Sequence, residues 1–446
     1  MPSMVFPAQL LNALRARPWL AMFLLCLVLR LLFLAAMLWQ VGAAPLLTMS
    51  PDTVDYVGAA DAIRGGWDYD TKGTLIFGPG YPMFLALMQI LTGGSGLALL
   101  LVNIVLNAMG SVLLYVWAHK LVHDQRIAIA AALLNACSLT SISLANILLS
   151  ETLFVFLLLL GLIAFLKANE SGRVLMYVLS GLVMAAAVLV RSMGQFLVVL
   201  LPVIAWLVNS GTRPTYKRIS WSLLSCVVMI VPVVLWSQQY HRNHGVFSPS
   251  LAGSGGIAQL VRSVYSATEG VSFVQSREWF DSAVVARQNE THDLFGSFND
   301  VAWQKLRQFL ADCPGTVAKE YLKMIDGNIH NEFSMFGAQL PRWSKAYDTM
   351  RIFNSKKGLN YRVSLLALIG AWMLIRKRAY RTLTVLLLLY LYFAAVAGFS
   401  MWQTSRIFYP GQIAWTVLAA FPLVAMYEWV KAWVSQRLSR RSPREL

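Results

Sequence analysis

Long apolar runs separated by short polar segments dominate the chain. A run of about 20 mostly apolar residues is long enough to cross a bilayer as an α-helix. About ten segments meet or approach this length. The predicted spans are Pro18–Gln40, Leu97–Ala118, Ile127–Leu144, Leu148–Leu166, Val174–Val190, Phe196–Val208, Ser220–Trp236, Tyr361–Ile375, Thr382–Ser400 and Tyr409–Tyr427. The pattern predicts an all-α polytopic membrane protein.

Three other segments refine this picture. Met83–Leu91 is apolar but too short to span, so it predicts an interfacial or re-entrant helix, which would bring the number of membrane helices to about 11 or 12. Val301–Ile325 is amphipathic and is interrupted by Pro314 and Gly315, which predicts helices of a small, mainly helical extracytoplasmic domain. The glycine-rich run 253–256 matches no phosphate-binding pattern and predicts a flexible loop.

The composition excludes several classes of protein. Only 13% of the 446 residues are charged and 57% are hydrophobic, whereas a soluble domain carries about 25% charge. Soluble and intrinsically disordered proteins are therefore excluded. The four cysteines are scattered without metal-ligand spacing, so neither a zinc site nor a disulfide framework is predicted.

The net charge of +16 reflects membrane topology. Many basic residues fall in alternate short loops and in the C-terminal tail, and the positive-inside rule then places both termini in the cytoplasm. Basic residues there would contact anionic membrane lipids, and no nucleic-acid partner is expected. We expect an integral protein of the bacterial inner (plasma) membrane.

The topology suggests three parts. Residues 1–236 form an N-terminal transmembrane catalytic module with a first extracytoplasmic loop at 41–96. Residues 237–360 form an extracytoplasmic loop or domain, which carries 11 of the 21 acidic residues. Residues 361–446 provide the C-terminal transmembrane helices and a basic cytoplasmic tail.

Ionisable side chains at or near membrane depth are costly and therefore indicate function. Asp52, Asp55, Glu151, Arg191 and Arg406 are predicted near the extracytoplasmic ends of spans. Asp52 or Thr53 could simply cap an amphipathic helix on which Tyr56, Ala60 and Ile63 share one face. Asp52 could equally act as a general base on an acceptor hydroxyl or amine. Arg30 interrupts the first span and is a further candidate.

The other charged candidates also allow two interpretations. Glu151 could cap its helix, or it could act together with Asp52, with the pair dividing base and positioning roles or binding a divalent cation such as Mg²⁺ or Mn²⁺. Arg191 and Arg406 could form structural salt bridges with these acids, or they could clamp a lipid-linked phosphate. Lys72 is a weaker candidate for the phosphate role.

In order along the chain, these residues resemble the GT-C glycosyltransferases, a superfamily that includes dolichyl-phosphate-mannose protein mannosyltransferases and bacterial transferases acting on lipid A. The matching segments are Asp52-Thr53-x-x-Tyr56, Gly78-Pro79-Gly80-Tyr81-Pro82, Ser150-Glu151-x-Leu153-Phe154, Arg191 and Ser405-Arg406-Ile407-Phe408-x-Pro410. Ile407 departs from the tyrosine often found there, and the long loop matches little.

This resemblance implies an inverting glycosyltransferase. It would move a hexosyl- or pentosyl-type sugar from a polyisoprenyl-phosphate donor to a protein, lipid or glycan acceptor on the extracytoplasmic face. Asp52 would be the base, with Asp55 a competitor, and Glu151 the supporting acid. The resemblance further implies that Lys72, Arg191 and Arg406 face the donor phosphate. Tyr56 and Tyr81 would line the substrate pocket.

Three alternatives remain open at this stage. An O-antigen polymerase or ligase-type enzyme would depend on arginines of the long loop more than on Asp52. A lipid or solute transporter is disfavoured because the sequence has no internal repeat and the charges gather at one membrane face. A purely structural membrane subunit is disfavoured by the number of ionisable residues at the extracytoplasmic helix ends.

Overall fold

The computed structural model describes residues 17–48, 50–208, 214–331, 333, 358–400 and 404–441, and this part of the chain is helical with no strand. The first helices are α2 (Pro18–Val41), α3 (Pro51–Gly66), α4 (Lys72–Phe77), α5 (Gly80–Thr92), α6 (Gly96–Val122), α7 (Gln125–Ala136), α8 (Leu139–Ala145), α9 (Ser150–Ser171), α10 (Val174–Val190) and α11 (Leu197–Leu207), with 3-10 turns η1 (Ala44–Leu47) and η2 (Ser192–Gly194). The others are α12 (Thr215–His244), α13 (Ala252–Glu269), α14 (Phe273–Thr291), α15 (Leu294–Asp312), α16 (Pro314–His330), α19 (Gly358–Arg376), α20 (Tyr380–Ala397) and α21 (Ser405–Arg441).

Six of these helices are long and apolar enough to cross a membrane, namely α2, α6, α9, α12, α20 and α21. The pair α7 and α8, bent by 61° at its break, would make a seventh span. Nine of the ten predicted spans coincide with one helix each, and Ile127–Leu144 is divided between α7 and α8; α10 and α11 are shorter than the spanning length. The all-α class is therefore confirmed for the described residues, while the figure of about ten spans stays a prediction.

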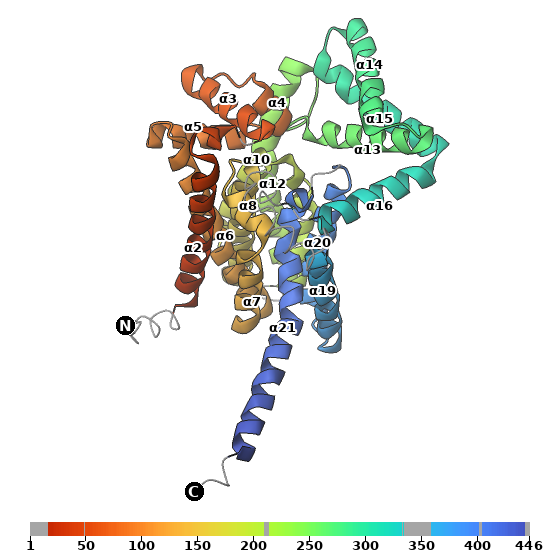
Figure 1. Ribbon diagram of the computed structural model, residues 1–446. Helices are drawn as coiled ribbons and strands as arrows, with labels where there is room; N and C mark the ends of the chain where they lie inside the picture. The colour runs from red at the N-terminus through yellow and green to blue at the C-terminus, as the bar shows by residue number, and fades with distance from the viewer. Residues whose placement is uncertain are drawn as a thin grey trace.

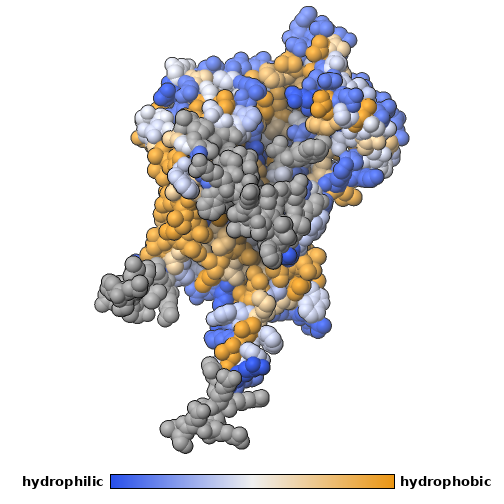
Figure 2. Space-filling view, viewed as in Figure 1, coloured by the Kyte–Doolittle hydropathy of each residue, from blue (hydrophilic) through white to orange (hydrophobic). Residues whose placement is uncertain are grey.

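The helices form two groups (Figure 1). The apolar helices run side by side, and a hydrophobic band crosses the middle of the molecule between hydrophilic ends (Figure 2). The α13–α16 unit projects on the side where α3 lies, opposite the start of α2 and the end of α21 (Figure 1). It packs around its own hydrophobic core, which includes Ile257, Val261, Phe280 and Val301.

Two predictions about local structure in the α13–α16 unit have opposite outcomes. The interruption at Pro314 is confirmed, since α15 ends at Asp312 and α16 begins at Pro314. The loop predicted at 253–256 is wrong, because these glycines lie inside α13. A Cβ on Gly256 would lie only 3.1 Å from the Phe399 backbone oxygen, so this glycine permits close packing rather than flexibility.

The break between α7 and α8 explains the buried arginine of the first span. Arg30 is fully buried and donates from Nη1 to the Ala136 carbonyl at 2.9 Å, at the carboxyl end of α7. Its Nε donates to Asn107 Oδ1 at 2.8 Å and its Nη2 to Ser141 Oγ at 2.9 Å. A guanidinium stabilises the free carbonyls and the negative dipole end of a helix. Arg30 therefore holds a broken helix in place.

The glycine–proline segment that opens α5 packs against the residues before Arg191. A Cβ on Gly80 would lie 2.6 Å from Val190 N and 2.7 Å from the Leu189 carbonyl carbon. We expect Gly80→Ala to lower the free energy of unfolding by about 1–3 kcal/mol, because these backbone atoms must move. Thermal unfolding of the purified protein measures this loss.

Gly110→Ala is the matched control for this substitution. Gly110 lies inside α6, and a Cβ there would meet no atom within 4 Å. Alanine is the better helix former by roughly 0.5–1 kcal/mol, so this variant is expected to be at least as stable as the parent. Equal losses in both variants would contradict a specific close contact at Gly80.

Candidate active site

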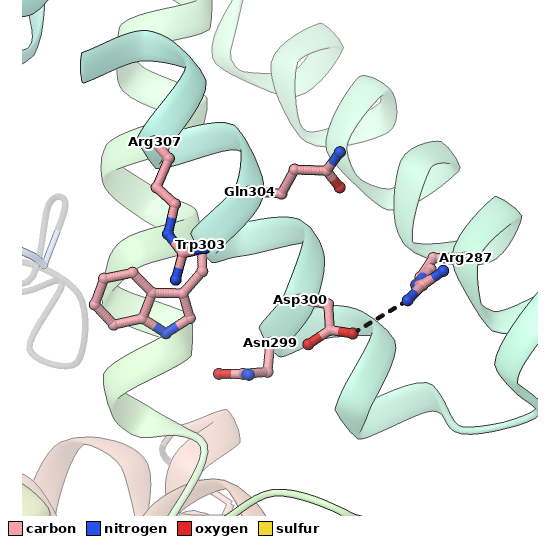
Figure 3. A pocket seen from close by; sticks show the side chains of 6 residues that line it. All are labelled: Arg287, Asn299, Asp300, Trp303, Gln304 and Arg307. Carbon is pink, nitrogen blue, oxygen red and sulfur yellow. Dashed lines mark ion pairs between the residues drawn. The ribbon is translucent and has the colours of Figure 1, made fainter. Parts of the chain in front are cut away.

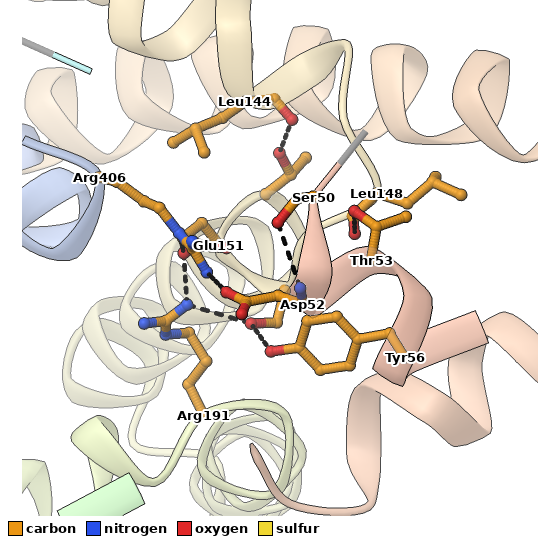
Figure 4. Close-up of polar contacts among 11 residues, drawn as sticks. Ser50, Asp52, Thr53, Tyr56, Leu144, Leu148, Glu151, Arg191 and Arg406 are labelled. Atoms are coloured by element: carbon orange, nitrogen blue, oxygen red, sulfur yellow. Dashed lines mark hydrogen bonds and ion pairs between the residues drawn. The ribbon is translucent and has the colours of Figure 1, made fainter. Parts of the chain in front are cut away.

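One arginine joins two carboxylates that are far apart in the sequence. Arg406, in the first turn of α21, donates from Nη2 to Oδ2 of Asp52 at 2.5 Å. Its Nε donates to Oε1 of Glu151 (Figure 4). Asp52 lies at the start of α3 and Glu151 at the start of α9. The fold thus brings together three residues that the sequence singled out.

A second arginine completes the charge balance. Arg191 directly follows α10, and its Nη1 lies 2.7 Å from Oε1 of Glu151 and 3.1 Å from Ser150 Oγ. The Glu151 side chain is 0% exposed, and a buried carboxylate is costly unless it is paired. Two guanidinium groups supply that pairing, so the salt bridges that were one of the two interpretations of these arginines are present.

The cluster still has unused donors and acceptors. Among the described residues, no partner contacts Nη1 of Arg406 or Nη2 of Arg191. Oε2 of Glu151 is buried without a hydrogen bond. The Asp52 side chain is 27% exposed. Because a guanidinium carries five N–H donors in a planar fork, the two arginines can bind an anion while they remain paired with the acids.

Local capping places Asp52 in the cluster. Of the two interpretations that the sequence allows for Asp52, the one in which Asp52 or Thr53 caps α3 is wrong. Ser50 is the cap residue, and its Oγ accepts a hydrogen bond from Asp52 N at 3.2 Å. Pro51 favours the first helical position because it has no N–H to satisfy. The Asp52 carboxylate is therefore free to reach Arg406, and Thr53 donates to the Leu148 carbonyl at 3.1 Å.

An irregular segment before α9 determines where the Glu151 side chain lies. Asn103 Nδ2, on α6, lies 2.9–3.0 Å from three carbonyl oxygens of residues 144–147. Thr152 Oγ1 donates to the Leu144 carbonyl at 3.1 Å. Buried carbonyls in the last turn of a helix, here the end of α8, and in the segment that follows it need such partners. The side chains of Asn103 and Thr152 therefore fix the backbone that leads to Glu151.

Hydrogen bonds between hydroxyl groups hold the start of α21. Ser405 Oγ lies 2.6 Å from Thr140 Oγ1, and Tyr409 OH lies 3.0 Å from Ser141 Oγ. Thr140 and Ser141 both belong to α8, the second half of the broken helix. These contacts flank Arg406 on either side along the chain, so α8 positions its guanidinium.

The second pair of predicted residues lies apart from this cluster. Lys72 Nζ contacts Asp55 Oδ2 at 2.9 Å, and the Lys72 side chain is 68% exposed. No hydrogen bond or ion pair joins either residue to Asp52, Glu151, Arg191 or Arg406 among the described contacts. The structure therefore brings Arg191 and Arg406 to the acids but does not bring Lys72 there.

We expect Lys72→Ala to change the turnover of a lipid-linked sugar donor by less than about threefold, since exposed ion pairs contribute about 0–1 kcal/mol. Initial rates at saturating donor test this expectation. A loss of a hundredfold or more would return Lys72 to the phosphate-binding role. Lys319→Ala, a lysine change on α16, serves as the control.

Tyr56 and Tyr81 are buried next to Ser150, at the edge of the charged cluster. Each is 1% exposed, and their rings meet edge to face at 4.7 Å. Tyr56 OH lies 2.9 Å from Ser150 Oγ, which also accepts from Arg191. Burial raises the pKa of the Tyr56 phenol, so it stays protonated. As placed, these tyrosines support Ser150 and Arg191; lining a substrate pocket stays a prediction.

The two acids do not fit a divalent cation as arranged. Arg406 already bridges them, and Arg191 adds a second positive charge to Glu151. Among the described residues, no group of three His, Cys, Asp or Glu side chains could hold a metal ion. Mg²⁺ prefers octahedral oxygen ligands, and here a guanidinium takes the position between the carboxylates.

We therefore expect donor turnover to be unchanged within about twofold after dialysis against EDTA, because the arginines supply the positive charge. Turnover measured before and after dialysis, with Mg²⁺, Mn²⁺ or Zn²⁺ restored afterwards, checks this. A loss of a hundredfold that one cation restores would show that Asp52 and Glu151 rearrange to bind it.

The part of the chain that the structure describes is thus helical, with the apolar helices of a membrane protein and a cluster of two acids and two arginines, and known proteins share its fold. Residues 77–236 match the family model described as dolichyl-phosphate-mannose-protein mannosyltransferase. This segment contains Tyr81, Glu151 and Arg191, whereas Asp52 and Arg406 lie outside it. The match confirms the resemblance to GT-C glycosyltransferases over that segment. No curated protein matches the chain.

Solved structures of the oligosaccharyltransferase of Archaeoglobus fulgidus have a similar fold. One is AglB with an inhibitory peptide and a dolichol-phosphate, with 14% identity and a TM-score of 0.52, covering 97% of this chain and 53% of that one. A second, tethered to an acceptor peptide with the NVT sequon, has 15% identity, a TM-score of 0.52 and coverages of 95% and 51%. A third, with Zn and sulfate, has 14% identity, a TM-score of 0.50 and coverages of 94% and 50%. The chain spans about half the length of these proteins.

Proposed function

We propose that the chain is an inverting glycosyltransferase that takes a sugar from a polyisoprenyl-phosphate carrier at the extracytoplasmic membrane face. The observation that carries the proposal is the bridge from Arg406 to Asp52 and Glu151, with Arg191 paired to the same Glu151 oxygen. A transfer of this kind needs a base for the acceptor and positive charge for the leaving phosphate. Both are present in one small cluster.

The residues have separate roles in this reaction. An acceptor hydroxyl or amine attacks the anomeric carbon from the face opposite the carrier, so the new bond forms as the carbon–oxygen bond to phosphate breaks. Asp52 takes the acceptor proton, and the carrier phosphate leaves with the bonding electrons. Asp52 suits the base role because it is the more exposed of the two clustered acids. Glu151, fully buried, holds both guanidinium groups.

The arginines would bind the carrier phosphate through the N–H groups that the acids leave free. Binding of the donor's monoanionic phosphodiester at Arg406 would weaken the hold of Arg406 on Asp52 and release that carboxylate to act as a base. Donor binding would in this way free the Asp52 carboxylate to take a proton from the acceptor. The donor supplies its own leaving group, and no step is routed through a metal ion or a nucleotide.

The comparisons support a lipid-linked donor. One similar structure contains a dolichol-phosphate, and two contain peptides. By analogy, the acceptor classes of this chain include protein, beside the lipid and glycan acceptors predicted from the sequence. The proposed site faces the same side as α3 and the α13–α16 unit (Figure 1).

The test is a transfer assay with the purified full-length protein and a panel of polyprenyl-phosphate sugars. Consumption of one lipid-linked donor, with release of polyprenyl phosphate, is the expected result. If no donor is consumed, donor binding is measured next. Neither turnover nor binding with any donor would reject the proposal and favour the polymerase or transporter alternatives.

A further inference from the structure

A polar pocket in the α13–α16 unit lies apart from the charged cluster. Its volume is about 600 Å³, within the roughly 300–1,000 Å³ typical of small-ligand sites. The side chains that line it are Arg287, Asn299, Asp300, Trp303, Gln304 and Arg307 (Figure 3). Nothing in the proposed transfer step uses these residues.

The helical period of α15 explains why several of the residues that line the pocket lie together. Asn299, Trp303 and Arg307 are spaced by four residues and therefore share one face of the helix. The core residue Val301 lies on the other side of α15, and Ala302 and Leu306 border the pocket face; all three belong to the hydrophobic core of the unit. The pocket face is thus free of the packing that stabilises the unit.

An exposed indole lies on this face. Trp303 is 44% exposed and takes no part in the hydrophobic core of the unit, whereas Trp279 stacks on Tyr265 at 3.9 Å and packs against that core. A flat aromatic surface beside amide and charged groups can hold a ring that is apolar on its face and polar at its edge. A sugar ring has this character.

The charges in the pocket favour an anion. Arg287 is balanced by Asp300 at 3.5 Å and Glu290 at 2.8 Å. Arg307 has no ion pair among the described residues, and its guanidinium is available for a phosphate or carboxylate. Asn299 accepts from Ser254 Oγ at 2.7 Å through Oδ1, which leaves its NH₂ group as a donor to the pocket.

The Asn299 end of the pocket is tied to the candidate active site. Ser254 lies near the start of α13, and four residues earlier Ser250 Oγ donates to Ser192 Oγ at 3.0 Å. Ser192 directly follows Arg191. A short stretch of chain and two hydrogen bonds therefore connect the pocket to the residue beside a proposed phosphate-binding arginine.

We propose that this pocket binds an anionic sugar, a saccharide bearing a phosphate or carboxylate, with its ring on Trp303 and its anion at Arg307. The role of the pocket in transfer rests on the proposed function: the pocket would hold the non-reacting part of a glycan acceptor. The binding itself does not depend on transfer.

The test uses the full-length protein in detergent and three probes: trehalose 6-phosphate, trehalose and inorganic phosphate. Saturation-transfer difference NMR is expected to show the phosphosugar ring protons in contact with the protein. The phosphosugar should bind at least about tenfold more tightly than trehalose, because trehalose lacks the anion that forms a charge-assisted hydrogen bond. It should bind at least about tenfold more tightly than inorganic phosphate, because phosphate has no ring to lie on Trp303. Phosphate binding as tight as the phosphosugar would overturn the proposal.

Variants separate the two parts of the ligand. Trp303→Ala should abolish the ring-proton signals, and Arg307→Gln should remove the tenfold advantage of the phosphosugar over trehalose. Leu310→Ala on α15 and Lys319→Gln on α16 lie outside the pocket and should change neither. Unchanged signals in Trp303→Ala, or tighter binding of an acidic heptapeptide that competes at the same residues, would overturn the proposal.

Failure here is distinguishable from failure of the proposed function. Donor consumption with a small soluble acceptor should persist in Trp303→Ala, because that reaction needs only the charged cluster. Phosphosugar binding without donor turnover by the parent protein would reject the transferase and leave the pocket. Donor turnover without phosphosugar binding would reject the pocket alone.

Discussion

Asp52→Asn is expected to lower the turnover of a lipid-linked donor by roughly 10²–10⁴-fold, the range that loss of a general base produces. The substitution keeps the shape of the side chain and removes its capacity to take a proton. Helix α3 should remain intact because Ser50, not Asp52, caps it. The change removes a first-turn dipole contribution of about 0.3–1 kcal/mol and also the ion pair with Arg406, so the unfolding midpoint should fall as well. Initial rates with the purified variant, beside its thermal unfolding midpoint, measure both quantities.

Asp55→Asn and Asp61→Asn are matched controls on the same helix. Asp55 pairs with Lys72 and Asp61 with Arg64, both away from Arg406. Neither change should lower turnover by more than about threefold, consistent with weak exposed pairs. A hundredfold loss in Asp55→Asn together with near-normal turnover in Asp52→Asn would move the base to Asp55.

Much of the fold could be predicted because apolar runs carry the signal directly. Every predicted span except Ile127–Leu144 coincides with one helix, and α3 buries Tyr56, Ala60 and Ile63 as its period indicates. The break at residues 137–138 could not be predicted, since it depends on Arg30 reaching the end of α7 from another helix. The lengths of α10 and α11 were also uncertain, because hydropathy locates a helix better than it locates its ends.

The site could be predicted in part for a related reason. A charge near membrane depth is conspicuous in a sequence, so Asp52, Glu151, Arg191 and Arg406 stood out. Which charges meet depends on packing, and sequence spacing did not separate Lys72 from the two arginines. Asn103 carried no signal of its own, although it fixes the segment before Glu151; Ser150 entered only as the first residue of the segment that contains Glu151. A polar residue inside an apolar run was the only clue available for Asn103.

Arg406→Gln should have the second large effect, on both stability and turnover. Removing one partner of a buried ion pair costs about 3–5 kcal/mol, and here it leaves Glu151 with Arg191 alone. Loss of a donor to a developing phosphate charge lowers turnover by roughly 10²–10³-fold. Thermal unfolding and initial rates are measured on the same preparation. Arg126→Gln, which breaks an exposed arginine–glutamate pair with Glu428, is the control and should change neither.

Arg406→Lys separates the structural role of this residue from the chemical one. Lysine keeps the positive charge and three N–H donors, but its compact ammonium lacks the planar fork with which Arg406 contacts Asp52 and Glu151 and still offers a donor to a phosphate. We therefore expect stability close to the parent and turnover at least about tenfold lower. If instead turnover falls only in proportion to the folded fraction in both variants, Arg406 acts solely as a salt bridge. The phosphate would then have to be bound by Arg191, whose Nη2 has no partner among the described residues.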